Sequence, residues 1–423
     1  MRTPPIVPRF RPALALAAGV SLAAACGGDA RPSETVGTPP AEAALQTLPT
    51  PAASPSGEPF LATGANGAVY LSWLERTSDS THALRLSTLA GKRWTAPRTI
   101  AERADFFVNW ADFPSVIEAE PGRLMAHWLQ RRGGGKYSYD VMLATSTDSG
   151  ATWSEGRILH HDGVAAEHGF VAMWHADGGG VEAAWLDGRG TATTDQQTRA
   201  MHVATSTIGR DGIPGQEVLL DRRSCDCCQV AAVRTARGPV VAYRDRTADE
   251  VRDIAVVRRV DGRWSEPAVV HHDGWQIAAC PVNGPALAAR GDTVVIAWFT
   301  GAQDTARVRV AYSVDAGATF APPVRVDDGN PAGRVDVELL EDGTAAVSWL
   351  ERTDSTLAEV RLRRVPRRGA PGAPVVLARS SGARASGFPR IARQGDALIA
   401  AWTEPGEAPR VQTARFDLDG LPR

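Results

Sequence analysis

The chain has 423 residues, of which 22% are charged, and its formal net charge is −2 at pH 7. Removing residues 1–25 takes away three arginines and no acid, which would bring the charge from −2 to −5. A weakly acidic chain lacks the basic surface that nucleic-acid binding needs, so we expect no nucleic-acid partner.

The first predicted element is a targeting segment over residues 1–25. Its arginine-bearing start leads into an apolar run over 13–25, about half as long as a membrane-spanning helix requires. The run ends SLAAAC, which resembles a bacterial lipoprotein signal with cleavage before Cys26 and lipid on that residue. The resemblance implies a cell-envelope protein anchored in the lipid bilayer, and Gly27 favours the outer membrane of a Gram-negative-type bacterium. An ordinary secretory signal is the alternative.

Residues 26–57 form the next predicted unit, a flexible tether. They are rich in Pro, Ala, Thr and Ser and carry too few bulky apolar side chains to fold by themselves. One stretch inside them, ALQTL at 44–48, reads as a strand that belongs to the body of the protein.

The body, residues 58–423, is dominated by a repeated apolar strand that ends in an aromatic residue. Successive copies are 51 to 58 residues apart, and a regular period of this size indicates a repeat architecture. The marker residues are Trp73, Trp128, Trp185, Tyr243, Trp298, Trp349 and Trp402.

Each repeat divides into four short strands separated by Gly, Asp and Ser turns. No segment has a sustained helical period, so we predict an all-β chain. Four-stranded units arranged around an axis form a β-propeller. Seven markers favour seven blades, with six as the alternative. The last repeat lacks a fourth strand, which 44–48 would supply. We expect a monomer.

Two turns share the pattern Ser-x-Asp-x-Gly-x-Thr-aromatic, STDSGATW at 146–153 and SVDAGATF at 313–320. Their aspartates accept hydrogen bonds from amides in the turn, and their glycines take positive φ. This is the Asp box, and the chain resembles the sialidase-like propeller superfamily, also called bacterial neuraminidase repeat proteins. The residues with this structural role are Ser146, Asp148, Gly150, Trp153, Ser313, Asp315, Gly317 and Phe320.

The resemblance implies an active site with three arginines that grip a carboxylate, a tyrosine nucleophile activated by a glutamate, and an aspartate as acid/base. This chain lacks the family's Arg-Ile-Pro motif, and none of its five tyrosines has the family's placement. Three fall in predicted strands, and Tyr137 and Tyr139 in a loop. We therefore favour a binding protein. A sialidase-type exo-glycosidase is the alternative, with Asp112, Asp253 or Asp336 as acid/base.

The stretch RRSCDCCQV at 222–230 holds three of the five cysteines, Cys225, Cys227 and Cys228. It leads into the predicted fourth blade, and Cys280 leads into the fifth, so the four should lie close together. Three uses remain open. A disulfide to Cys280 would staple two blades, as an oxidising compartment favours. A thiolate site would hold copper or zinc, with His168 as a further ligand. A reactive redox pair is the third use.

Other polar and aromatic residues fall in the loops that precede the inner strands or join the second and third strands. These loops meet on one face of a propeller, where we expect a central pocket for an anionic or sugar-like ligand. The candidate ligand-binding residues are Arg244, Arg246, Arg252, Arg334, Arg390, Trp110, Trp275, Asn283 and His168.

Overall fold

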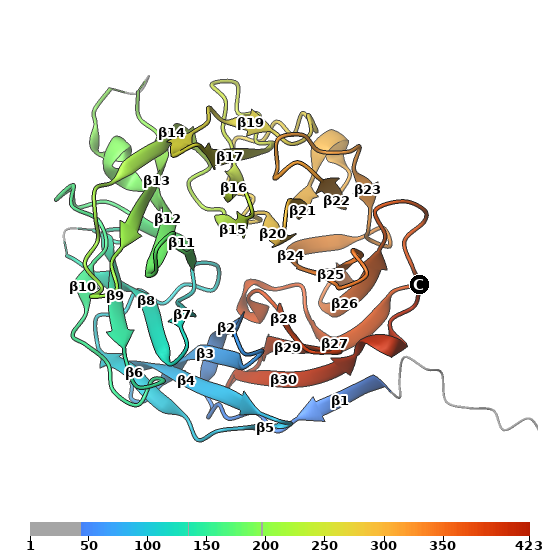
Figure 1. Ribbon diagram of the computed structural model, residues 1–423, viewed down its shortest axis with the longest axis horizontal. Coiled ribbons are helices and arrows are strands. Elements are labelled where there is room, and N and C mark those ends of the chain that lie inside the picture. The colour runs from blue at the N-terminus through green and yellow to red at the C-terminus, as the bar shows by residue number, and fades with distance from the viewer. Residues whose placement is uncertain (1–43, 134, 196–197) are drawn as a thin grey trace, which may run out of the picture. The chain divides into compact units, whose positions relative to one another are not determined.

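The structure, a computed structural model, describes residues 44–133, 135–195 and 198–423. The expected signal and Cys26 lie outside these residues. Seven antiparallel sheets follow one another around a central axis (Figure 1). The chain is therefore an all-β, seven-bladed β-propeller, and the six-blade alternative is wrong. Within the described ranges, no helix has the length and apolar character needed to cross a membrane.

The strands of each blade run from the axis outward. The inner strands are β2 (Ser56–Thr63), β7 (Ser115–Glu120), β11 (His168–His175), β15 (Ala231–Thr235), β20 (Ala286–Arg290), β24 (Pro331–Leu339) and β28 (Arg390–Gln394). The second strands are β3 (Val69–Arg76), β8 (Arg123–Arg131), β12 (Val181–Asp187), β16 (Gly238–Arg244), β21 (Thr293–Thr300), β25 (Ala345–Arg352) and β29 (Ala397–Glu404).

The third strands are β4 (His82–Ala90), β9 (Tyr139–Ser146), β13 (Met201–Ile208), β17 (Ile254–Val260), β22 (Arg307–Ser313), β26 (Leu357–Val365) and β30 (Arg410–Asp417). The outer strands are β5 (Arg93–Trp94) with β6 (Arg98–Arg103), β10 (Arg157–Ile158), β14 (Val218–Ser224), β18 (Arg263–Trp264) with β19 (Ala268–Val269), β23 (Val324–Arg325), β27 (Val375–Ser381) and β1 (Leu45–Leu48). Short 3-10 turns are η1 (Gly188–Ala192), η2 (Ala302–Asp304), η3 (Arg384–Ser386) and η4 (Leu418–Gly420).

The N-terminal strand β1 completes the seventh blade. It pairs antiparallel with β30, with Leu45 opposite Phe416 and Leu48 opposite Thr413. The last blade is thus assembled from both ends of the described chain, as the ALQTL stretch predicts. Because β2 begins at Ser56, the propeller starts before residue 58, and the tether does not reach 57.

The repeated tryptophans form the cores between blades. Trp73, Trp185 and Trp349 are fully buried. Each indole N–H donates to a carboxylate two residues later, for example Trp185 to Asp187 at 2.9 Å and Trp349 to Glu351 at 2.6 Å. Residues i and i+2 share one side of a strand, so the Trp-Leu-acid pattern carries its own acceptor for the buried indole.

The two repeated turns join the third and fourth strands of blades two and five, as predicted. In the first, Asp148 accepts hydrogen bonds from the Thr152 backbone N–H at 2.9 Å and from its hydroxyl at 2.6 Å. Asp315 makes the same pair of bonds with Thr319. The aromatic residues that end both turns, Trp153 and Phe320, pack against blade cores. These aspartates are occupied in holding the turns.

Candidate functional site

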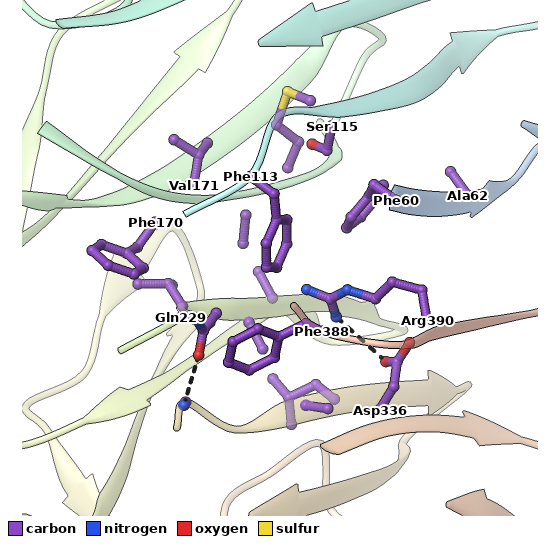
Figure 2. A pocket seen from close by; sticks show the side chains of 18 of the residues that line it. Phe60, Ala62, Phe113, Ser115, Phe170, Val171, Gln229, Asp336, Phe388 and Arg390 are labelled. Carbon is purple, nitrogen blue, oxygen red and sulfur yellow. Dashed lines mark hydrogen bonds and ion pairs between the residues drawn. The ribbon is translucent and has the colours of Figure 1, made fainter. Parts of the chain in front are cut away.

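A cavity of about 250 Å³ lies on the axis, which we call the hub cavity. Its walls come from all seven inner strands and the loops before them. Aromatic side chains at the start of these strands are Phe60, Phe113, Phe170 and Phe388 (Figure 2). The cavity thus combines flat apolar faces with the polar side chains described below.

One end of the hub cavity is closed by packed side chains. Phe388 stacks on Trp110 with ring centroids 5.9 Å apart and lies 5.8 Å from Phe113. Gln229 crosses the same region: its side-chain N–H donates to the carbonyl of Ala111 at 2.6 Å, and its oxygen accepts from the Gly284 N–H at 2.9 Å. This aromatic plug links the loops that lead into blades two, four, five and seven.

Exposure rises along the inner strands away from the plug. Phe113 and Phe388 are buried, whereas Thr63 and His175, near the ends of their strands, line the cavity and are exposed. The hub cavity therefore opens at the C-terminal ends of the inner strands. We expected a pocket on the opposite face, where the plug lies.

The polar centre of the hub cavity is the pair formed by Arg390 and Asp336 (Figure 2). The guanidinium lies 3.7 Å from the carboxylate and also packs over the ring of Phe113, 4.4 Å from its centroid, and that of Phe60. Nε of Arg390 is buried and lacks a hydrogen-bond partner among the described residues. A desolvated guanidinium with unused donor capacity is a binding group for an oxygen-rich or anionic ligand.

The carboxylates along β24 are shifted toward their neutral forms. Burial raises the pKa of Asp336, although Arg390 and the N–H groups of Ile391 and Val337 oppose the shift. Burial, followed by the charge of Asp336, raises the pKa of Glu338 to about 8. Both groups lie on the same side of β24, and Asp336 is the one of the two that lines the hub cavity and pairs with Arg390.

Three inner strands begin with a β-bulge, and the pairing register shifts at each. In each, a glycine precedes a residue with positive φ, namely Glu58, Phe170 or Arg334. Such bulges re-aim side chains and are common next to functional sites. Here one of them brings Phe170 to the wall of the hub cavity.

Two predicted ligand-binding arginines are committed to the protein itself. Arg244 is buried and donates to the carbonyls of Asn283, Arg252 and Phe299 at 2.6–2.9 Å. Arg334 donates to Ser386 and to the carbonyls of Ala383 and Gly387. Burial lowers the pKa of Arg334 to about 10. The expected multi-arginine grip is therefore not assembled, because these guanidiniums tie loops together.

Other predicted residues are also engaged internally. Asp253 accepts from the N–H groups of Gly274 and Trp275, and Asn283 accepts from the Arg334 N–H while donating to two carbonyls. The rings of both approach-loop tryptophans are covered: Arg244 lies over Trp275, and Arg334 and Arg384 lie over Trp110. These contacts correct our expectation that they face a ligand.

Asp112 belongs to a buried group with Tyr139 and Glu167. The Tyr139 hydroxyl lies 2.7 Å from Glu167 and 3.2 Å from Asp112. Tyr139 begins β9 and is not in a loop as predicted, and Phe107 stacks on its ring at 3.9 Å. Burial, then the two carboxylates, raises the pKa of Tyr139 well above its usual value. Burial also raises the pKa of Asp112, and that of Glu167 to about 7.

His168 lies in a separate ion-pair network. It contacts Asp162 at 2.8 Å and Asp187 at 3.7 Å and stacks on His160. Arg189 reaches both aspartates, at 3.2 and 2.7 Å, and supplies their counter-charge. The carboxylates and imidazoles of this network are grouped closely enough to ligate a metal, but the arginine already occupies that electrostatic role. His168 does not join the cysteines.

The four described cysteines are free thiols, and no disulfide is present among the described residues. Cys225 Sγ lies 3.2 Å from Cys228 Sγ and 3.8 Å from Cys227 Sγ. Cys280 lies beside Cys227, whose thiol is the main cause that lowers the pKa of Cys280. The prediction that Cys280 lies near the cluster is confirmed, and the expected disulfide is not formed.

Charged side chains surround these sulfurs. Arg252 donates to Cys225 Sγ at 3.2 Å and to Glu250 at 2.7 Å, and Arg246 pairs with Asp226 and Glu250. Hydrogen bonds from Cys227 and Cys228, with the charge of Arg252, lower the pKa of Cys225 well below its usual value. Arg246 and Arg252 are thus at the cysteine cluster and not at the hub cavity.

Several residues that shape the hub cavity were not predicted from the sequence. Phe60, Phe113 and Phe388 each adjoin a proline just before or within the start of an inner strand, and this recurrence was the available signal. Gln229 had no comparable signal, because nothing in its sequence neighbours shows which side chains reach the axis.

Comparisons with known proteins agree with this architecture. No protein family matches the sequence, and no curated protein does. Solved structures match at 10–17% identity. A protein of unknown function from Dyadobacter fermentans has a TM-score of 0.51 over 88% of this chain and 97% of its own, at 14% identity. The polysaccharide lyase Uly1 has a TM-score of 0.51 over 86% of this chain and 90% of its own, at 10% identity.

The NanB sialidase from Streptococcus pneumoniae has a TM-score of 0.45, with 13% identity, over 89% of this chain and 70% of its own. The fold and the hub cavity together define a seven-bladed propeller with a site on its axis. The expected propeller fold is confirmed by the blades themselves, and at these identities a likeness to solved structures shows the fold alone.

Proposed function

We propose that this protein binds a small anionic or sugar-like ligand in the hub cavity. The single observation that carries the proposal is Arg390, a desolvated guanidinium with a buried, unpartnered Nε in a cavity lined by phenylalanine rings. Carbohydrate and carboxylate sites combine such flat apolar faces with a few polar groups that fix orientation.

The size of the cavity limits the ligand. At about 250 Å³, the hub cavity is smaller than the roughly 300–1,000 Å³ typical of sites for drug-sized ligands. A monosaccharide, above all a sugar acid whose carboxylate would meet Arg390, matches this size. Longer glycans would enter by one terminal residue from the open end.

Cell-envelope placement is part of the proposal. It rests on the SLAAAC sequence before Cys26, which resembles a lipoprotein signal and would place the propeller on a lipid anchor at the outer membrane. Palmitate labelling of the expressed protein, compared between wild type and Cys26→Ser, tests it. Unlabelled wild-type protein would contradict it.

Ligand binding is tested by titrating the purified propeller calorimetrically with glucuronate, galacturonate and N-acetylneuraminate, with glucose as the neutral counterpart. Arg390→Met should abolish binding of a sugar acid, whereas the matched control Arg263→Met, at an exposed position outside the cavity, should bind as wild type does. If none of these sugars binds wild type, the proposal fails.

A glycan hydrolase of sialidase type is the second candidate. Asp336 favours it, because glycosidases use a carboxyl with a raised pKa as general acid, and Asp336 lines the hub cavity. The tyrosine arrangement disfavours it, since Tyr139 is fully buried and its raised pKa is the reverse of an activated nucleophile. Turnover of a fluorogenic sialoside or glucuronide that Asp336→Asn abolishes would favour the hydrolase over the binding protein.

A further inference from the structure

The cysteine cluster, Cys225, Cys227, Cys228 and Cys280, lies outside the residues that line the hub cavity, so ligand binding there does not explain it. We propose that this cluster is a site for one thiophilic metal ion, zinc(II) or copper(I), held by three or four thiolates and joining blades four and five.

The first support is the placement of the sulfurs. The Sγ atoms of Cys225, Cys227 and Cys228 all lie within 4.8 Å of one another. In a tetrahedral zinc site with Zn–S bonds of about 2.3 Å, ligand sulfurs are about 3.8 Å apart. The distance from Cys225 to Cys227 is 3.8 Å, and that from Cys225 to Cys228 is 3.2 Å.

The second support is that the sulfurs form one shared group and not two separate pairs. Cys225 approaches both Cys227 and Cys228, so these three sulfurs share contacts around one centre. Two independent disulfides would need each sulfur to face a single partner. A turn at 226–227 replaces the extended chain expected from the sequence, and it directs all three sulfurs inward.

The third support is the charge around the cluster. Arg246 and Arg252 pair with two carboxylates, Asp226 and Glu250. Arg244, whose carbonyl accepts from the Cys225 N–H, donates to backbone carbonyls. A zinc ion with four thiolates, or a copper(I) ion with three, carries a net charge of −2. Arg252, which donates to Cys225 Sγ at 3.2 Å, is placed as the partner that stabilises such a centre.

Burial supplies the fourth support. Cys225 and Cys228 are buried, Cys227 is partly exposed and Cys280 is exposed. An ion can therefore reach the cluster from solvent past Cys280, while the inner sulfurs exclude water. On binding, each thiol proton is released to solvent and its sulfur lone pair is donated to the metal, with no change of oxidation state.

The test is metal reconstitution of the full propeller. The protein carrying Cys26→Ser, which removes the one cysteine outside the cluster, is reduced, freed of metal by chelation and titrated without oxygen. One titration uses zinc(II) and the other copper(I). We expect one ion per chain, a loss of titratable thiols on binding, and a higher melting temperature with metal bound.

Two variants make the result specific. Cys280→Ser removes an exposed sulfur and should not affect folding, and Cys225→Ser removes the sulfur shared by two contacts. We expect affinity to fall at least about 10–100-fold in Cys225→Ser. Ala279→Ser, next to Cys280 but without a ligand change, should bind as the parent does.

Two measurements distinguish a zinc site from a copper site. Sulfur-to-metal charge-transfer bands after cobalt(II) substitution identify a tetrahedral zinc-type site. Tighter binding of copper(I), measured in competition with a chelator, identifies a copper site. Substoichiometric uptake of both ions, or uptake that Cys225→Ser leaves unchanged, overturns the proposal. The proposal is also overturned if the purified protein contains disulfides between these cysteines and, after they are reduced, still binds no metal.

Discussion

Arg390 of β28 and Asp336 of β24 meet inside the hub cavity, across the seam between blades six and seven, with 3.7 Å between guanidinium and carboxylate. Both oxygens of Asp336 accept from backbone N–H groups, whereas the Arg390 guanidinium retains a free donor. The pair is therefore available to be reorganised by a ligand.

This relationship predicts opposite effects for its two members. Asp336→Asn removes the competing charge, so a sugar acid should bind Arg390 more tightly, by about 10-fold for a single improved charge-assisted hydrogen bond. Arg390→Met should bind no sugar acid. Titration calorimetry of both variants measures the difference, and weaker sugar-acid binding in Asp336→Asn would be the opposite of the expected result.

Glu338 predicts a pH dependence of stability. Its pKa is about 8 in the folded protein, against an ordinary value of 4.5. The folded state thus holds a proton that the unfolded state releases, and stability falls as pH rises from about 4.5 to about 8. Glu58 and Glu167, both raised to about 7, act in the same direction.

Melting temperatures recorded across this range should decline, and Glu338→Gln should lessen the decline. Glu341→Gln is the matched control, because Glu341 is exposed and Arg393 lowers its pKa. An identical pH profile of the melting temperature for wild type and Glu338→Gln would show that the Glu338 carboxyl is not protonated in the folded protein.

Substitution of Glu351 should show how much free energy of unfolding is lost when a buried indole N–H has no acceptor. Its carboxylate accepts from Trp349 at 2.6 Å and from the Asn330 N–H at 2.7 Å. Glu351→Ala should lower the free energy of unfolding by about 1–3 kcal/mol for each donor left unsatisfied. Glu404 holds the same repeat position in blade seven but is exposed, so Glu404→Ala should cost much less in the same denaturant titration.

The hydrogen bonds of Gln229 are expected to stabilise the aromatic plug at the closed end of the hub cavity. Gln229→Ala loses the bonds to Ala111 and Gly284, which should destabilise the fold by about 1–3 kcal/mol. It should also speed hydrogen exchange at the Gly284 amide. Gln229→Glu keeps an acceptor for that amide but no donor for Ala111, so exchange at Gly284 should remain slow. Rapid exchange in both variants would mean that another group protects this amide.

The fold was predictable because its signals are local and repeated. The tryptophan markers, the two Ser-x-Asp-x-Gly turns and the ALQTL strand each specify geometry within a few residues. The site was only partly predictable, because the sequence does not show whether an arginine donates its hydrogen bonds to backbone carbonyls or lines a cavity. Arg244, Arg334 and Arg390 look alike in sequence, and only Arg390 lines the hub cavity. The cysteines were placed together correctly, but their turn was not foreseen.

The closing strand β1 has a mechanical consequence. It holds four residues, and β30 is the described strand with which it pairs, while Leu48 packs in the core of the first blade and Gln46 accepts from Lys92. Any pull on the chain before Leu45 enters the molecule through this ladder, ahead of every other strand. Because β1 and β30 run antiparallel, a pull along the strand axis loads all rungs together in shear. The ring would therefore resist a pulling force at its shortest closing strand, and it would open only when all the backbone hydrogen bonds between β1 and β30 break together.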